Sequence, residues 1–85
     1  MLIETTMRYD PERDVVWVWP DRRDPFLVSR AAVEGLAENE RLSEDELLDA
    51  CREHEASLAE AAAHKREVGE IDPDGRVVVT SRDLH

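Results

Sequence analysis

The fold is decided by a run of five β-branched or aromatic residues, Val15-Val16-Trp17-Val18-Trp19. The run is too short for a helix, and residues of these types pack well on a pleated sheet, so it predicts a strand. Proline-containing segments bound it on both sides, Tyr9–Asp14 and Pro20–Pro25, and both are typical of turns. Because side chains alternate along a strand, the two valines inside the run share one face and the two tryptophans the other. The strand is therefore apolar on both faces.

Three further strands are expected around this one. Leu2–Met7 precedes the first turn, and Phe26–Val28 follows the second turn, so that the three strands form a meander. A last β-branched stretch, Arg76–Thr80, follows the turn Asp72–Gly75 near the end of the chain. The sheet is thus expected to have about four strands.

Between the third and fourth strands the pattern changes to helical spacing. Ser29 can cap a short helix over Arg30–Glu38, and Asn39 is a suitable end for it. Ser43 and Glu46 match the capping box, in which each side chain accepts a hydrogen bond from the other residue's backbone amide.

A long helix is expected from Glu44 to Val68, because no proline or glycine interrupts this stretch and Gly69 suits the left-handed residue that ends a helix. Its apolar residues recur at three-four spacing, which predicts the face that packs on the sheet. They are Leu47, Leu48, Cys51, His54, Leu58, Ala61 and Ala62.

Together these elements predict an α+β fold. Residues 1–85 form a single compact domain: a small antiparallel sheet of about four strands in the order β-β-β-α-α-β, with one short and one long helix packed on one face.

Charge narrows the class of partner. The 85 residues include 11 Lys+Arg and 21 Asp+Glu, a net charge of −10. This balance argues against direct nucleic-acid binding and against docking on an anionic membrane, and it favours a protein partner with a basic surface. The N-terminal residues lack the basic and apolar regions of a signal peptide, and the single Cys51 cannot form an internal disulfide. We therefore expect a cytoplasmic protein.

The negative charge is concentrated in one segment. Ten acidic residues and only two arginines lie between Glu34 and Glu60, so this segment carries −8 of the total −10. On one continuous helix, Glu46, Asp49, Glu53 and Glu60 would fall on a single outward arc. This acidic ridge would extend about 21 Å with about 7 Å between carboxylates, comparable with the phosphate spacing of a nucleic-acid strand.

Two interpretations of the acidic ridge stay open. It is either a contact for a basic partner or a solvated helix face that keeps a small protein in solution. A sharper form of the first interpretation is a DNA mimic of phage or mobile-element origin, such as an anti-CRISPR or anti-restriction protein. Its carboxylates would occupy a groove meant for phosphates.

Trp17 and Trp19 also allow two interpretations, one functional and one structural. One layer of helices can cover only one face of the sheet, so the tryptophan face needs another explanation. It is either a dimer interface or docking surface, since aromatic residues are enriched in interface cores, or ordinary partial exposure of large side chains.

The chain shows little sign of catalysis or cofactor binding. Its three glycines are widely separated, and no nucleophile elbow or phosphate-binding loop occurs. Cys51, His54 and Glu55, with Glu60 and His64 four residues apart, have permissible metal-ligand spacing on a helix. Cys51 and His54 fall on the expected core face, however, and no second cluster completes a ligand set. We expect no metal, no cofactor and no enzymatic activity.

Several ordered pieces of the sequence resemble the domain-of-unknown-function 1488 family, a group of short bacterial proteins. The matching pieces are Ser29–Val33, Leu47-Leu48, Cys51-Arg52, Lys65, Gly69, Asp72–Val77 and Thr80–Leu84. The chain departs from the family pattern at Cys51 and Arg66, where the family has aromatic residues, and near Glu55, where it has a basic one. The resemblance implies a small α+β fold and brings no established activity.

The sequence thus favours a small acidic protein-interaction module or regulator without enzymatic activity. The expected contact residues are Glu46, Asp49, Glu53 and Glu60, and Trp17 and Trp19 are the expected dimer or docking surface. The alternative is the DNA-mimic inhibitor of a nucleic-acid-binding complex.

Overall fold

A computed structural model describes residues 6–20 and 24–84 of the chain. The elements are β1 (Thr6–Asp10), β2 (Val15–Trp19), β3 (Phe26–Ser29), α1 (Arg30–Ala37), α2 (Glu44–Glu53), α3 (Glu55–Glu67), β4 (Val78–Val79) and the 3₁₀ helix η1 (Ser81–Leu84). The start of the predicted first strand and the middle of the loop Pro20–Pro25 lie outside the described residues.

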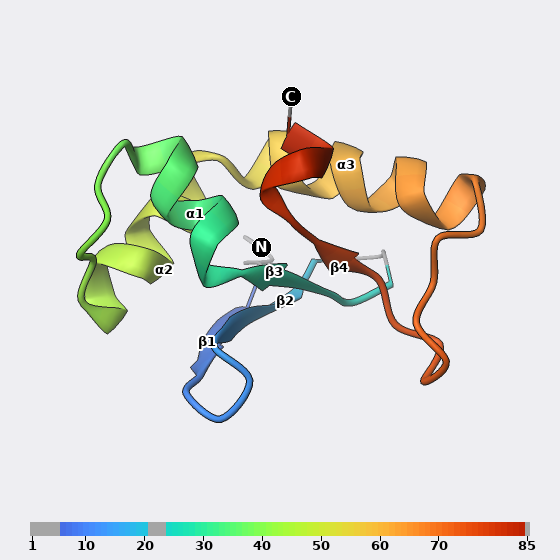
Figure 1. The fold of residues 1–85 in the computed structure, drawn as a ribbon, viewed down its shortest axis with the longest axis horizontal. Coiled ribbons are helices and arrows are strands. Elements are labelled where there is room, and N and C mark those ends of the chain that lie inside the picture. Colours follow the sequence, from blue (N-terminus) through green and yellow to red (C-terminus); the bar gives the residue numbers. More distant parts are fainter. Residues whose placement is uncertain (1–5, 21–23, 85) are drawn as a thin grey trace, which may run out of the picture.

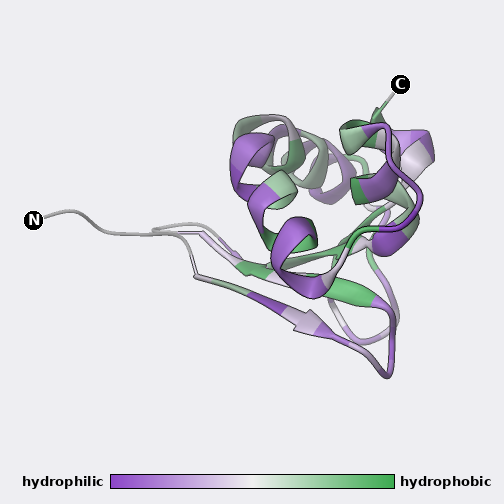
Figure 2. Ribbon diagram, turned by 90° about the vertical axis from the view of Figure 1, so that its left-hand side faces the viewer, coloured by the Kyte–Doolittle hydropathy of each residue, from purple (hydrophilic) through white to green (hydrophobic). Residues whose placement is uncertain are grey.

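The α+β architecture is confirmed. The strands form one sheet in the order β1-β2-β3-β4, and the helices lie on one face of it (Figures 1 and 2). Val16 and Val18 of β2 are fully buried beneath the helices, together with Leu47 of α2 and Leu58 of α3. These residues belong to the single core cluster found among the described residues. No helix within residues 6–20 and 24–84 is long and apolar enough to span a membrane.

The sheet is mixed rather than antiparallel. β1 pairs with β2 and β2 pairs with β3 in antiparallel fashion, but β4 runs parallel to β3. Three helices connect β3 to β4 across one face of the sheet, and such a crossover returns the chain in the same direction. The expectation of four antiparallel strands is therefore wrong for the last strand.

β4 is shorter than the predicted Arg76–Thr80. Before it, the Val77 carbonyl accepts a hydrogen bond from the Leu27 amide at 2.9 Å. After it, the Thr80 amide donates to the Asp83 carboxylate at 2.8 Å instead of to a strand, and η1 begins at Ser81. The side chain of Asp83 thus turns the chain away from the sheet.

Both predicted helix starts are confirmed. The Ser29 hydroxyl accepts from the Ala32 amide at 3.2 Å, and Ser43 and Glu46 form the complete capping box. α1 ends at Ala37, one residue before the predicted Glu38, because Glu38 itself takes the left-handed conformation with φ 54°.

The long helix is divided in two at His54, whose backbone angles leave the helical range (φ −106°, ψ 19°). α2 packs against α1 and β1, whereas α3 packs against β4 and η1. One straight helix could not follow both directions around the sheet, so packing explains a break that no glycine or proline signals. The prediction of one helix from Glu44 to Val68 is wrong at this point.

Candidate functional site

The residues of the predicted acidic ridge all lie on the surface, but on two helices. Glu46, Asp49 and Glu53 belong to α2 and Glu60 belongs to α3, and all four are exposed. Because the helix breaks at His54, Glu60 does not continue the line of the other three. The even spacing derived for a single helix therefore does not hold across all four residues.

Glu46 also has a structural task. Its carboxylate accepts a hydrogen bond from the Ser43 amide at 3.1 Å, while the Ser43 hydroxyl accepts from the Glu46 amide at 3.3 Å. The hydrogen bonds from Ser43, first of all that from its backbone amide, lower the pKa of the Glu46 carboxyl. Asp49 and Glu53 cap no helix and make no hydrogen bond of this kind within the described part of the chain.

The exposed acids of α2 have no ion-pair partner among residues 6–20 and 24–84. The ion pairs between described residues join Arg30 to Asp14 and Glu34, Lys65 to Asp83, and Arg66 to Asp24. None of these pairs involves Asp49, Glu53 or Glu60. Within α2, one basic residue, Arg52, stands among five acidic ones. We call Asp49 and Glu53, with Glu46 beside them, the α2 acidic face.

The tryptophan face is present as predicted. The rings of Trp17 and Trp19 stack, with centroids 5.6 Å apart and planes inclined by 10°. Arg76 lies over the Trp17 ring at 4.7 Å, and the Trp17 indole N–H donates to Asp10 at 3.2 Å. Trp19 is the more exposed of the two, at 39%. This face of the sheet thus presents a pair of stacked aromatic rings, and Arg76 and Asp10 hold the Trp17 ring in place.

The residues with metal-ligand spacing are not brought together. Cys51 is fully buried in the core, and desolvation raises the pKa of its thiol to about 12. His54 lies at the break between α2 and α3, partly buried. Within the described chain, no group of three or more His, Cys, Asp or Glu side chains could hold a metal ion.

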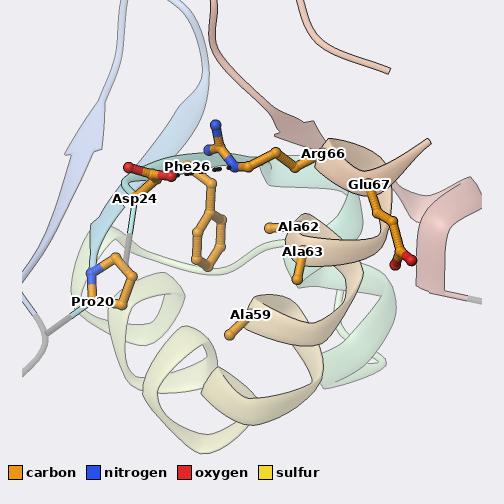
Figure 3. Close-up of a pocket in the computed structure, with 8 residues that line it drawn as sticks. All are labelled: Pro20, Asp24, Phe26, Ala59, Ala62, Ala63, Arg66 and Glu67. Atoms are coloured by element: carbon orange, nitrogen blue, oxygen red, sulfur yellow. Dashed lines mark ion pairs between the residues drawn. The ribbon is translucent and has the colours of Figure 1, made fainter. Parts of the chain in front are cut away.

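A groove that the sequence did not predict lies beside α3, and we call it the α3 groove (Figure 3). Its volume is about 510 Å³, and it is open along one side. The lining residues are Pro20, Asp24, Phe26, Ala59, Ala62, Ala63, Arg66 and Glu67. The sequence signal for it is the alanine spacing at Ala59, Ala62 and Ala63, where short side chains leave room beside the helix.

The fold has a known counterpart, although no family model and no curated protein matches the chain. It superposes on the crystal structure of a protein of unknown function from the domain-of-unknown-function 1488 family of Shewanella loihica PV-4, with a TM-score of 0.74. The superposition covers 86% of this chain and 84% of the other, at 14% sequence identity. The chain therefore has the fold of a member of the domain-of-unknown-function 1488 family, which confirms the resemblance at the level of the fold.

Proposed function

We propose that the chain is a non-enzymatic protein-interaction module or regulator that binds a partner with a basic surface. The observation that carries this proposal is the α2 acidic face: Asp49 and Glu53 are exposed and have no ion-pair partner among the described residues. Like charges four residues apart on a helix repel each other, as Asp49 and Glu53 do. Lysine or arginine side chains of a partner would relieve that repulsion on binding.

Electrostatics also supports this class of partner. With a net charge of −10, the chain attracts a basic surface over a distance of about 8–10 Å at ordinary ionic strength. Such attraction raises the association rate and rejects acidic competitors.

The test is a comparison of two charge-reversed variants in a pulldown from the source cell's lysate. Asp49→Lys/Glu53→Lys alters the α2 acidic face without touching the Glu46 cap. Glu12→Lys/Asp74→Lys makes the same change of net charge in two exposed turns. Both variants must first show the circular dichroism spectrum of the native protein.

We expect the native protein and the turn variant to capture the same partner, and the α2 variant to lose it. Retention of that partner by the α2 variant would contradict the proposal. Equal loss by both variants would also contradict it, since binding would then follow net charge rather than this face.

The DNA-mimic inhibitor uses the same carboxylates and is the second proposal, supported by the −8 carried between Glu34 and Glu60. The break at His54 weakens its geometric basis, because Glu60 leaves the line of α2. It predicts that the native protein competes with DNA for a captured nucleic-acid-binding complex at low salt, and that added salt weakens its binding steeply. Capture of a complex whose DNA binding is unaffected by the protein would rule it out.

A further inference from the structure

The α3 groove has apolar walls that its own side chains do not fill. Phe26 is 3% exposed and forms one wall, and the apolar residues that α3 contributes to the lining are all alanines. Figure 3 shows the Phe26 ring standing between Pro20 on one side and the three alanines on the other. Because an alanine side chain is a single methyl group, the space beside α3 stays open.

Charged side chains stand at the rim of the groove. Arg66 Nε lies 3.7 Å from the Asp24 carboxylate, and its Nη2 donates to the Pro25 carbonyl at 3.4 Å. Asp24 is 72% exposed in its side chain, and Glu67 is exposed at the other side. Among the described residues of the rim, two carboxylates therefore stand beside one arginine.

A further exposed carboxylate, that of Glu60, lies on α3 outside the lining of the groove. Ala63 lies three residues after Glu60 and four before Glu67, so the two carboxylates stand about one turn on either side of it. All three residues are exposed. An apolar group entering the groove beside Ala63 would therefore have a carboxylate on each side along the helix.

We propose that the α3 groove receives an aliphatic side chain of a protein partner, from a segment in which lysine or arginine residues flank that side chain. The inserted side chain packs against Phe26 and the alanines, and the flanking cations pair with Glu67 and with Glu60 or Asp24. This inference rests on the proposed function, since it supplies the basic partner with an apolar anchor.

Shape favours a protein segment over a small molecule. Small-molecule sites enclose about 70–90% of their ligand, which a groove open along one side does not. A side chain projecting from a partner needs no such enclosure, because the partner's own surface covers the open side. Aliphatic or aromatic anchors in pockets are also where binding energy concentrates at protein interfaces.

A peptide of alternating lysine and leucine serves as the probe, followed by two-dimensional NMR of the labelled protein. Two matched peptides replace every leucine by alanine or every lysine by glutamate. Ala63→Phe fills the groove from an exposed position, and Ala56→Phe places the same bulk at an exposed position of α3 outside it.

We expect the leucine peptide to shift the amide signals of Ala59, Ala63 and Glu67. Ala63→Phe and the alanine peptide should each weaken binding by about tenfold or more, the loss of one buried aliphatic side chain. Ala56→Phe should leave affinity unchanged, and the glutamate peptide should not bind. Absence of binding by the leucine peptide, equal binding by Ala63→Phe, or equal binding by the alanine peptide would each overturn the proposal.

The Asp49→Lys/Glu53→Lys variant separates this proposal from the proposed function. If the leucine peptide still binds this variant, and if Ala63→Phe still weakens that binding, the proposal for the α3 groove is supported even if the α2 acidic face does not bind the partner. If capture of the partner is lost in the α2 variant but is unaffected by Ala63→Phe, the proposed interaction module is supported. The proposal for the α3 groove is then contradicted.

Discussion

Cys51 shows how completely a single side chain can be withdrawn from solvent in a chain of this size. The thiol is fully buried in the core, and desolvation raises its pKa to about 12. An unfolded chain ionises its thiol near pH 8.5. Above that pH the unfolded state loses the proton first, so the free energy of unfolding falls as pH rises toward 12, by about 1.4 kcal/mol per pH unit at most.

Urea unfolding at pH 7, 9 and 10 measures this effect, and Cys51→Ala should remove the thiol's part of the decline. A thiol-specific colorimetric reagent at pH 8 should react with the unfolded protein and leave the native protein unmodified. Equal reaction rates in the two states would show that Cys51 is accessible.

Asp83 is another residue whose ionisation depends on the fold. Burial raises the pKa of its carboxyl, but hydrogen bonds from the Thr80 amide and from Lys65 outweigh burial and leave the pKa lowered. Lys65 Nζ donates to Asp83 at 2.9 Å and to the Val78 carbonyl at 2.7 Å. Lys65 thus joins α3 to β4 and, through the Asp83 carboxylate, to η1.

Asp83→Asn should lower the free energy of unfolding at pH 7 by about 1–3 kcal/mol, because it weakens a largely buried hydrogen-bonded pair. The lowered pKa contributes stability above the unfolded value, near pH 4, and this contribution is lost as pH falls through the folded value. Acid unfolding of Asp83→Asn should therefore depend less on pH than that of the native protein. Asp74→Asn, at an exposed turn, is the control and should behave like the native protein.

Among the helices and strands, features that depend on neighbouring residues could be predicted from the sequence. Features that depend on contacts between distant segments could not. The Ser29 and Ser43 caps depend on neighbours three residues away, so the sequence shows them directly. The break at His54 depends on α2 and α3 packing against different elements, and no residue type marks it. The parallel pairing of β4 also depends on the path of the chain. The α3 groove was missed for the same reason, since Phe26 and Ala63 meet only in the folded chain.

The capping box of α2 gives a test at this scale. Ser43→Ala should lower the free energy of unfolding by about 1 kcal/mol, because the Glu46 amide loses its acceptor. Ser57→Ala, an exposed position within α3, should change stability little or raise it slightly, since alanine favours helices. Thermal unfolding followed by circular dichroism measures both. An equal effect of the two substitutions would mean that the box contributes nothing beyond helix propensity.

At the scale of the molecule, the tryptophan face predicts a homodimer. Two chains of charge −10 repel each other, so added salt should strengthen association through Trp17 and Trp19. Trp19→Ser should remove the dimer, while Val68→Ser, at an apolar residue 54% exposed elsewhere on the surface, should leave it. Sedimentation equilibrium measures the mass directly. A mass of 9.7 kDa at every protein and salt concentration would show that this face does not mediate self-association.

The concentration of negative charge on α2 should lower the stability of the fold. Asp49 lies four residues from both Asp45 and Glu53, and such like-charged pairs destabilise a helix. Asp49→Lys turns two repulsive pairs into attractive ones and should raise the melting temperature by about 2–5 °C in low salt. Glu12→Lys, in a turn, should raise it less, and 0.5 M NaCl should reduce the difference by screening.

A more stable Asp49→Lys variant that no longer binds the partner would show that these carboxylates weaken the fold and act in recognition. An unchanged melting temperature would show that solvent screens the α2 acidic face fully. In that case relief of repulsion within α2 would add nothing to partner binding, and the direct attraction between these carboxylates and the partner's cations would be the only contribution of the α2 acidic face.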